Sequence, residues 1–190
     1  MAVEPIRDIK KIEAMKKILL ADRTFGKRNH LLFVFGINSG LRISDILSMT
    51  VVDVATAKGK VRKQVTIKEK KTGKNKTFVL NKNITAVLQE YLGEIPELSP
   101  DAPLFKSRKG NRALSRVQAW EILTNAAKAI GIENMGTHSL RKTFGYHAYR
   151  AGYGIEKLQE VFNHSSPAIT KRYIGITQDE INEIYISVNL

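Results

Sequence analysis

The last third of the chain contains residue types that together suit chemistry at a phosphate. His138 and Arg141 lie one helical turn apart, His164 follows 23 residues after the arginine, and Tyr173 lies nine residues later. Arginine grips anionic oxygens with a planar fork that stays charged, and imidazole exchanges protons near neutral pH. A phenol becomes a nucleophile when cationic neighbours or a base activate it. The spacing therefore predicts displacement at phosphorus, with Tyr173 as the attacking group.

A further arginine stands at a break between two predicted helices. Arg42 follows residues 39–41, Ser-Gly-Leu, and such a break presents the next side chain at a helix start rather than on a solvated face. Asp45 lies one turn farther on, where it either orients a catalytic cation or occupies the helix surface. Arg42 and Arg141 together would clamp the phosphate oxygens.

A lysine-rich turn supplies one more cation. Residues 70–74 read Lys-Lys-Thr-Gly-Lys between two runs of alternating apolar residues, which predicts the turn of a β-hairpin. Lys71 is our choice for the acid that protonates the departing oxygen, because of the Lys-Thr-Gly-Lys pattern. Lys70 and Lys74 are its rivals on the same turn.

This ordered set resembles the tyrosine recombinase (phage integrase) family, and within it the catalytic domain. The likeness runs from about Lys10 to Leu190 and is strongest in three segments, residues 40–45, 137–144 and 164–173. The chain departs from the family at Asn163, where Gly is usual, and at Lys142, where His is frequent. The resemblance implies a covalent 3′-phosphotyrosyl intermediate, which conserves the bond energy, so that no ATP, metal ion or other cofactor is needed.

The resemblance also implies a role for each residue. His138 would exchange a proton with the Tyr173 hydroxyl, and His164 would donate a hydrogen bond to the phosphate. Lys71 would protonate the departing 5′ oxygen, and Asp45 would orient a catalytic cation. The implied catalytic residues are Arg42, Lys71, His138, Arg141, His164 and Tyr173, with DNA contacts from Lys70, Lys74 and Arg172.

The charge of the chain points to a polyanionic partner. The sequence has 31 Lys and Arg against 18 Asp and Glu, a formal net charge of +13. A field of that sign concentrates polyanions and speeds their encounter. Nine of the basic residues fall between Lys58 and Lys76, together with one Glu and a series of alternating apolar residues. We therefore expect a basic hairpin, and double-stranded DNA as the partner.

Composition argues against several other kinds of site and protein. The chain has no cysteine, and no pair of histidines has the spacing of helical metal ligands, so no zinc site is expected, and His30 and His147 are interpreted as structural. The glycines at 36 and 40 are not followed by the Lys-Ser/Thr of a P-loop, so no nucleotide is expected. Residues 1–5 lack a signal-peptide pattern, and the apolar stretch 31–37 is far below the roughly 20 residues of a membrane span. These features predict a cytoplasmic protein that binds no membrane.

Hydrophobic periodicity predicts a mostly helical domain with a small antiparallel sheet, which agrees with the fold that the resemblance implies. Residues 1–190 are expected to form a single tyrosine recombinase catalytic domain, with no N-terminal core-binding or arm-binding domain. N-caps are expected at Ser44, at Asn81 or Asn83, and at Thr137. The expected helices cover residues 7–21, 27–38, 43–49, 84–92, 114–130, 137–151, 156–162, 167–174 and 178–188, and the expected strands cover 51–54, 60–67 and 76–80.

The function expected from these features is DNA strand cleavage and rejoining in site-specific recombination or integration, as in phages and other mobile elements. Two alternatives remain open: a non-catalytic DNA-binding regulator that keeps the fold, and a type IB topoisomerase-like enzyme that relaxes DNA. The last helix carries an apolar stripe, formed by Ile181, Ile184, Tyr185 and Val188. This stripe either folds back on the domain's own core or, as is common in the family, docks on a neighbouring subunit. We expect self-association on DNA through this helix.

Overall fold

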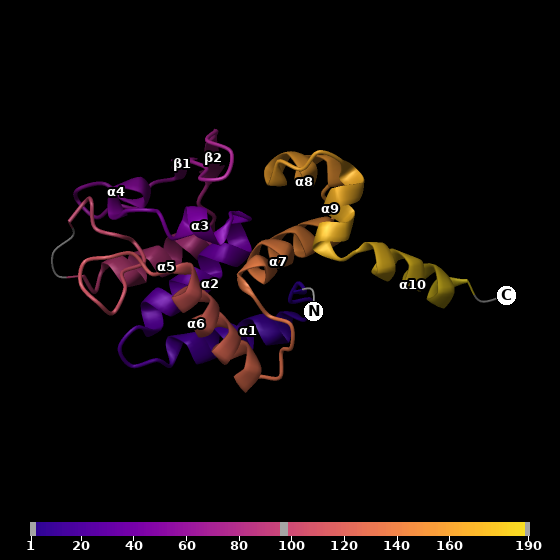
Figure 1. Ribbon diagram of the computed structural model, residues 1–190, viewed down its shortest axis with the longest axis horizontal. Coiled ribbons are helices and arrows are strands. Elements are labelled where there is room, and N and C mark those ends of the chain that lie inside the picture. The colour runs from indigo at the N-terminus through magenta and orange to yellow at the C-terminus, as the bar shows by residue number, and fades with distance from the viewer. Residues whose placement is uncertain (1–2, 96–98, 189–190) are drawn as a thin grey trace.

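The computed structural model describes residues 3–95 and 99–188, and within these ranges the chain forms ten helices and one two-stranded sheet (Figure 1). This confirms the predicted fold class, a mostly helical domain with a small antiparallel sheet. In chain order the elements are α1 (Ile9–Leu20), α2 (Gly26–Ser39), α3 (Ile43–Ile46), α4 (Val51–Val54), β1 (Gln64–Lys68), β2 (Asn75–Val79), α5 (Lys82–Leu92), α6 (Arg116–Ala129), α7 (Thr137–Arg150), α8 (Ile155–Phe162), α9 (Pro167–Ile174) and α10 (Thr177–Ser187).

Helix α2 is the centre of the larger hydrophobic core. Its residues 31–35 are all buried, and the helix packs against α1, α5 and α7. It ends at Ser39 and is capped by Gly40, whose left-handed conformation (φ 62°) is strained for residues with a Cβ. A Cβ at Gly40 would also lie 2.6 Å from the Phe144 ring. Glycine here therefore lets the chain turn sharply between α2 and α3, directly against α7.

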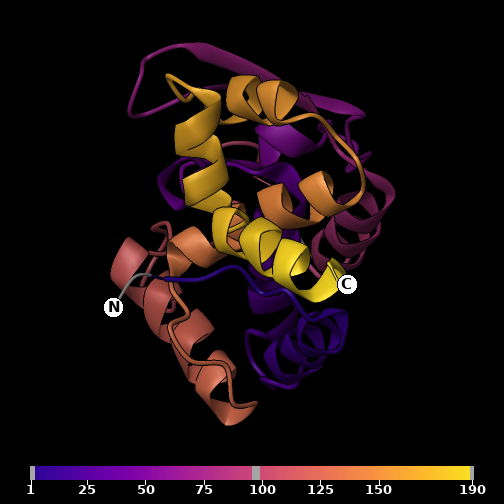
Figure 2. The ribbon, with the colours of Figure 1, turned by 90° about the vertical axis from the view of Figure 1, so that its right-hand side faces the viewer.

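Strands β1 and β2 form an antiparallel hairpin whose turn holds the lysine-rich segment. Ile67 pairs with Lys76 and Val65 with Phe78 in the register. Phe78 packs on the large core, where its ring meets Phe35 edge-on with centroids 6.1 Å apart. The hairpin projects from the same side of the molecule as α8, as Figures 1 and 2 show from two directions.

Helices α7, α8 and α9 enclose a second, smaller core. Its buried residues come from α8, α9 and the start of the α9–α10 connection, and α7 covers them with Phe144 and Tyr149. A Cβ at Gly145 would lie 2.5 Å from Ile174 and 2.7 Å from Phe162, so the close approach of α7 to α8 and α9 requires glycine there. The buried residues of this second core are Ile155, Leu158, Phe162, Ile174 and Ile176.

Three local expectations were wrong. Residues 51–54 were predicted to be a strand because of their valines, but they form α4. Thr50 and Asp53 make a capping box there, with the Asp53 carboxylate accepting hydrogen bonds from the Thr50 backbone N–H (2.8 Å) and hydroxyl (3.0 Å). Ser44 and Thr137 lie inside α3 and α7, whose N-caps are Arg42 and Gly136. Asn81 does cap α5, as predicted, by accepting a hydrogen bond from the backbone of Ile84.

Helix α10 leaves the body of the molecule and extends beyond α9 (Figure 1). No helix in the described ranges is long and apolar enough to cross a membrane. The side chains of Thr177, Gln178 and Ile184 lie outside the described part of the structure, so the apolar stripe predicted for this helix is assessed below without Ile184.

Candidate active site

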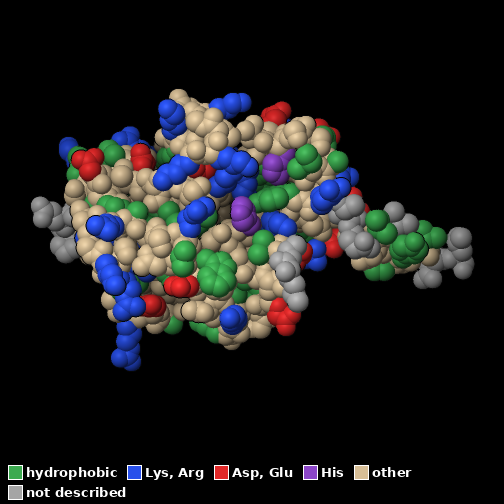
Figure 3. Space-filling view, viewed as in Figure 1, with side chains coloured by type: hydrophobic (Ala, Val, Ile, Leu, Met, Phe, Trp, Pro, Cys, Tyr) green, Lys and Arg blue, Asp and Glu red, His purple; other side chains and the backbone are tan. Residues whose placement is uncertain are grey.

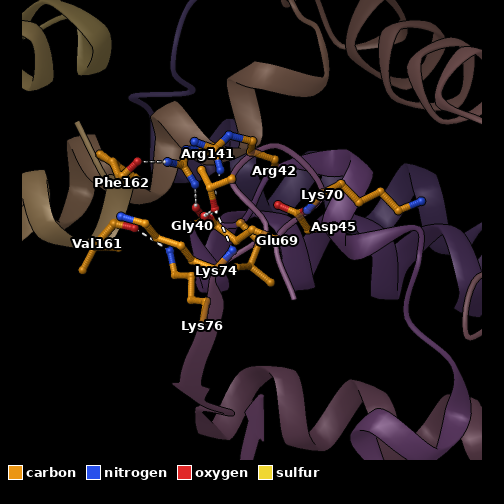
Figure 4. A network of polar contacts seen from close by, with 12 residues as sticks. Gly40, Arg42, Asp45, Glu69, Lys70, Lys74, Lys76, Arg141, Val161 and Phe162 are labelled. Carbon is orange, nitrogen blue, oxygen red and sulfur yellow. Dashed lines mark hydrogen bonds and ion pairs between the residues drawn. The ribbon is translucent and has the colours of Figure 1, made fainter. Parts of the chain in front are cut away.

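Arg141 lies at the point where the two cores meet. It projects from α7 and is 3% exposed. Its Nη1 donates a hydrogen bond to Gly40 O (2.6 Å), and its Nη2 donates one to Phe162 O (2.7 Å) (Figure 4). The guanidinium also lies 4.5 Å from the centroid of the Phe162 ring. Arg141 therefore links the end of α2 to the end of α8 through these two hydrogen bonds. Its charged guanidinium is buried within the candidate active site.

Arg42 is paired with a carboxylate that the sequence did not point to. As the N-cap of α3 it has extended backbone angles, and its Nη1 donates to Glu69 Oε1 at 2.9 Å. Glu69 is 3% exposed, and its Oε2 accepts a hydrogen bond from the Thr72 hydroxyl (2.7 Å). Burial would raise the pKa of Glu69, but the Thr72 bond and the charges of Arg42 and Lys76 outweigh it and hold that pKa below its ordinary value.

Asp45 contacts the hairpin backbone rather than an arginine side chain. Its Oδ1 accepts a hydrogen bond from the backbone N–H of Lys70 (2.9 Å), one residue before Lys71 (Figure 4). Asp45 is 1% exposed, and in the described part of the chain its Oδ2 has no hydrogen-bond partner. The carboxylate expected to orient a catalytic cation thus holds the start of the lysine-rich turn.

The lysine-rich turn and the first turn of α7 face a shared cavity of about 600 Å³. Arg42, Lys71 and His138 line it, so three of the predicted catalytic side chains meet there. Lys70 also lines the cavity, and both it and Lys74 are exposed on the turn. Figure 3 shows lysine and arginine side chains gathered around two histidines on this face of the molecule. The electrostatic setting therefore suits an anion.

Both predicted catalytic histidines have lowered pKa values. For His138 the cause is burial, followed by the positive charges of Arg141, Lys142, Arg42 and Lys71. The pKa of His164 is lowered by burial and by three of the same cations, Arg141, Arg42 and Lys71. The two imidazoles are therefore neutral at neutral pH without DNA, and a bound phosphate would raise their pKa values by offsetting these cations.

Tyr173 lies on α9 with its ring against His164. The ring centroids are 5.0 Å apart at 75°, and His164 Nδ1 bonds with Thr170 Oγ1 (3.1 Å), which leaves its Nε2 for another partner. Burial raises the pKa of Tyr173, although the charges of Arg141 and Arg42 oppose this rise. The phenol is thus protonated at neutral pH and needs a proton acceptor to attack. Within the described ranges, no hydrogen bond or ring contact joins Tyr173 to His138.

Lys76 is a second residue that the sequence analysis missed. Strand alternation places it on the same face of β2 as Phe78, and its ammonium donates a hydrogen bond to Val161 O in the last turn of α8 (Figure 4). Burial lowers the pKa of Lys76 to about 8, with further lowering by Arg141. The alternation of inward and outward residues along the strand could have identified Lys76 from the sequence. It was not recognised because the segment contains eight other basic residues.

The remaining predicted residues lie as follows. Arg172 is exposed on α9 beside Tyr173. His147 Nε2 is 2.9 Å from Ile6 O, which fits the structural role expected of it. Burial lowers the pKa of His30, and its Nδ1 has no hydrogen-bond partner among the described residues. No group of three or more His, Cys, Asp or Glu that could hold a metal ion is found in the described ranges.

Comparison of the sequence with known proteins finds a matching protein family and similar proteins. Residues 9–180 match the family model described as the phage integrase family. The chain is 43% identical over 183 residues to the probable integrase/recombinase YoeC of Bacillus subtilis (strain 168), covering 96% of this chain and 95% of YoeC. It is 26% identical over 178 residues to the tyrosine recombinase XerC of Pelobacter propionicus, covering 94% of this chain and 57% of XerC.

The fold has matching solved structures. The XerH site-specific recombinase bound to its palindromic difH substrate superposes with a TM-score of 0.74 at 21% identity, covering 97% of this chain and 53% of that chain. The chain therefore spans little more than half the length of the XerC and XerH proteins that it matches. These likenesses confirm the family and the catalytic-domain fold that the sequence predicted.

Proposed function

This chain belongs to the phage integrase family, and from that premise we propose that it cleaves and rejoins strands of double-stranded DNA in site-specific recombination. The observation that carries the proposal is that the candidate side chains come from separate elements and lie around one region of the molecule. Arg42, Lys71 and His138 line one cavity, while Arg141 joins it to the helix pair that holds His164 and Tyr173. Because the full set of groups is present, a regulator with a decayed site fits the chain less well. The matched region, residues 9–180, is the proposed catalytic unit.

The proposed reaction begins when the Tyr173 oxygen attacks the scissile phosphorus. A bond forms between that oxygen and phosphorus, the bond from phosphorus to the 5′ oxygen breaks, and the DNA 3′ end becomes a phosphotyrosyl ester. The phenol proton passes to a neutral imidazole, for which His138 is the proposed acceptor. Lys71 gives a proton to the departing 5′ oxygen. Attack by a 5′ hydroxyl of another strand reverses these steps and releases Tyr173.

The two arginines supply charge stabilisation without rearranging. Glu69 engages Arg42 through Nη1, and the Gly40 and Phe162 carbonyls fix the fork of Arg141. Donors that are held in place before the reaction stabilise the charge that develops on the non-bridging oxygens at little reorganisation cost. The incoming phosphate also favours the protonated form of His164, which can then donate to a phosphate oxygen as proposed.

Covalent trapping on DNA tests the proposed function. The substrate is a duplex nicked just beyond the cleavage position, so that the short 5′ fragment diffuses away and rejoining fails. Because the site sequence is unknown, nicked duplexes bearing random or candidate sequences are incubated with the protein, and adducts are detected after denaturation. A protein–DNA adduct at the 3′ end of the break is expected. Binding to the duplex with no adduct on any substrate would favour the non-catalytic regulator.

We further propose that helix α10 mediates self-association on DNA. Its acidic residues are held by the body of its own chain: Asp179 pairs with Arg7 (3.4 Å), and Glu180 pairs with Lys171 (3.3 Å). The apolar side chains described in α10 instead face solvent, with Ile181 41%, Tyr185 81% and Ile186 78% exposed, and Val188 just after the helix is 59% exposed. A helix anchored by ion pairs that leaves an apolar face uncovered suits a second copy of the chain.

Serine replacements at Tyr185 and Ile186 are expected to remove higher-order complexes on DNA but to spare strand cleavage. The two side chains are exposed, so their loss leaves the described cores intact. Native gel shifts with increasing protein report assembly, and adduct yield reports cleavage. Truncation after Thr177 should give the same result, except that it also removes the ion pairs. A collapsed melting transition in the serine variant would show that the helix packs on its own domain instead.

A further inference from the structure

We propose that Lys76 is a positioning residue that holds the α8–α9 unit, residues 155–174, against the hairpin and so sets His164 and Tyr173 relative to Arg42. The proposal rests on the proposed strand-transfer function and assigns Lys76 no contact with substrate. Its starting observation is the hydrogen bond from the Lys76 ammonium to Val161 O, which joins residues 85 positions apart in the chain (Figure 4).

The contact falls at the point of α8 that determines where His164 lies. The last carbonyls of a helix have no partner within the helix, and the negative end of its dipole favours cations. Lys76 binds Val161 O, and Arg141 binds the next carbonyl, Phe162 O. Asn163 then takes the left-handed conformation (φ 52°), and His164 follows with its N–H bonded to Gln159 O (3.0 Å). Two cations thus fix the backbone just before the histidine.

The α8–α9 unit makes few other contacts with the part of the site that contains Arg42. Its core is separate from the large one and is covered by α7. Within residues 3–95 and 99–188, no other hydrogen bond or ion pair joins the hairpin to residues 155–174. The hairpin itself is fixed to α3 through the Asp45 contact with Lys70 and the Glu69 pair with Arg42. Lys76 therefore links the hairpin, whose turn carries Lys71, to the α8–α9 unit, which carries the nucleophile.

The charges around Lys76 make this link sensitive to pH. Besides the Val161 carbonyl, the charges that act on the ammonium are those of Arg141 from α7, Arg42 at the N-cap of α3, Asp45 from α3, and Glu69, which directly follows β1. Its pKa of about 8 means that the ammonium is charged at neutral pH and loses its proton in mildly alkaline solution. The charge-assisted bond to Val161 O then becomes a weaker neutral one. A bound phosphate would raise this pKa, so on DNA the loss is expected at or above pH 8.

The test compares Lys76→Met, Lys76→Arg and Lys157→Met on a nicked suicide duplex. Lys157 is exposed on α8, so its replacement removes the same charge from the same unit without touching the link. Lys76→Met is expected to slow adduct formation by about 10- to 100-fold, the scale of a small misplacement of reacting groups. Its DNA affinity should match that of Lys157→Met, because each loses one charge. Equal adduct rates for Lys76→Met and wild type would overturn the proposal.

The pH dependence of adduct formation distinguishes a positioning role for Lys76 from a merely structural one, because a merely structural lysine would not change it. Wild-type adduct formation should fall as the pH rises above about 8, whereas Lys76→Arg should hold its rate because its guanidinium stays charged. Identical profiles for these two proteins would count against the proposal, even where Lys76→Met fails to fold.

Hydrogen exchange separates this inference from the proposed function. Lys76→Met should speed amide exchange in residues 155–174 and leave that of α2 unchanged, and this measurement needs no catalysis. Absence of any wild-type adduct would refute the proposed function. The hydrogen-exchange result would still test whether Lys76 holds the α8–α9 unit in place. Unchanged exchange in residues 155–174 would refute the link alone.

Discussion

Replacement of Tyr173 with phenylalanine is expected to abolish the covalent adduct with DNA. Only the hydroxyl oxygen is lost, while the ring that packs 5.0 Å from His164 and 5.7 Å from Phe162 is kept, so the fold and the site should persist. DNA affinity should stay within about threefold of wild type, because phosphate contacts with basic residues dominate such binding. Adducts are counted after denaturation, and affinity is measured on an uncut duplex.

Tyr153→Phe is the matched control for this experiment. Tyr153 is 61% exposed beyond the end of α7 and takes part in none of the site contacts described above, so removal of its hydroxyl should leave adduct formation at the wild-type level. A Tyr173→Phe protein that still forms the adduct would show that another residue is the nucleophile. Mass spectrometry of the adduct peptide would then identify that residue.

The sequence predicted those parts of the protein that depend on local order. Helix α1 follows from apolar residues at helical spacing, and the hairpin follows from alternation around a glycine turn. The spacing of His138 and Arg141 within one helix likewise brings both side chains to the site. The error at residues 51–54 has the same local origin: β-branched residues favour strands, but the capping box of Thr50 and Asp53 starts a helix.

What the sequence could not predict are pairings between residues far apart in the chain. Glu69 meets Arg42 across 27 residues, and Lys76 meets Val161 across 85. Both partners depend on how the hairpin packs on the helices, which no local pattern encodes. In a segment crowded with lysines, the packed structure distinguishes the half-buried Lys76 from the exposed Lys74. The same holds for Asp45, whose contact with the Lys70 backbone depends on the turn geometry.

Loss of either arginine is expected to slow cleavage by roughly two to three powers of ten, the range for removal of a preorganised charge donor. Arg141→Ala also leaves the buried Gly40 and Phe162 carbonyls unpaired, each at a cost of about 1–3 kcal/mol, so it should lower the melting temperature as well. Arg141→Lys keeps a positive charge but has only one donor nitrogen in place of the planar fork. It should therefore recover more stability than activity, because an ammonium can still bind a buried carbonyl but lacks the planar fork that grips two phosphate oxygens.

Arg42 allows a cleaner separation of stability from catalysis. Among the described residues, Arg42→Ala leaves the buried carboxylate of Glu69 with Thr72 as its remaining hydrogen-bond partner, so part of any effect will come from a charge that has lost its ion pair. The double variant Arg42→Ala/Glu69→Gln removes that charge but keeps the shape of the side chain. It should melt closer to wild type than Arg42→Ala, yet cleave as slowly, because the phosphate still lacks its clamp. Recovery of cleavage in the double variant to within tenfold of wild type would mean that Arg42 serves only to neutralise Glu69.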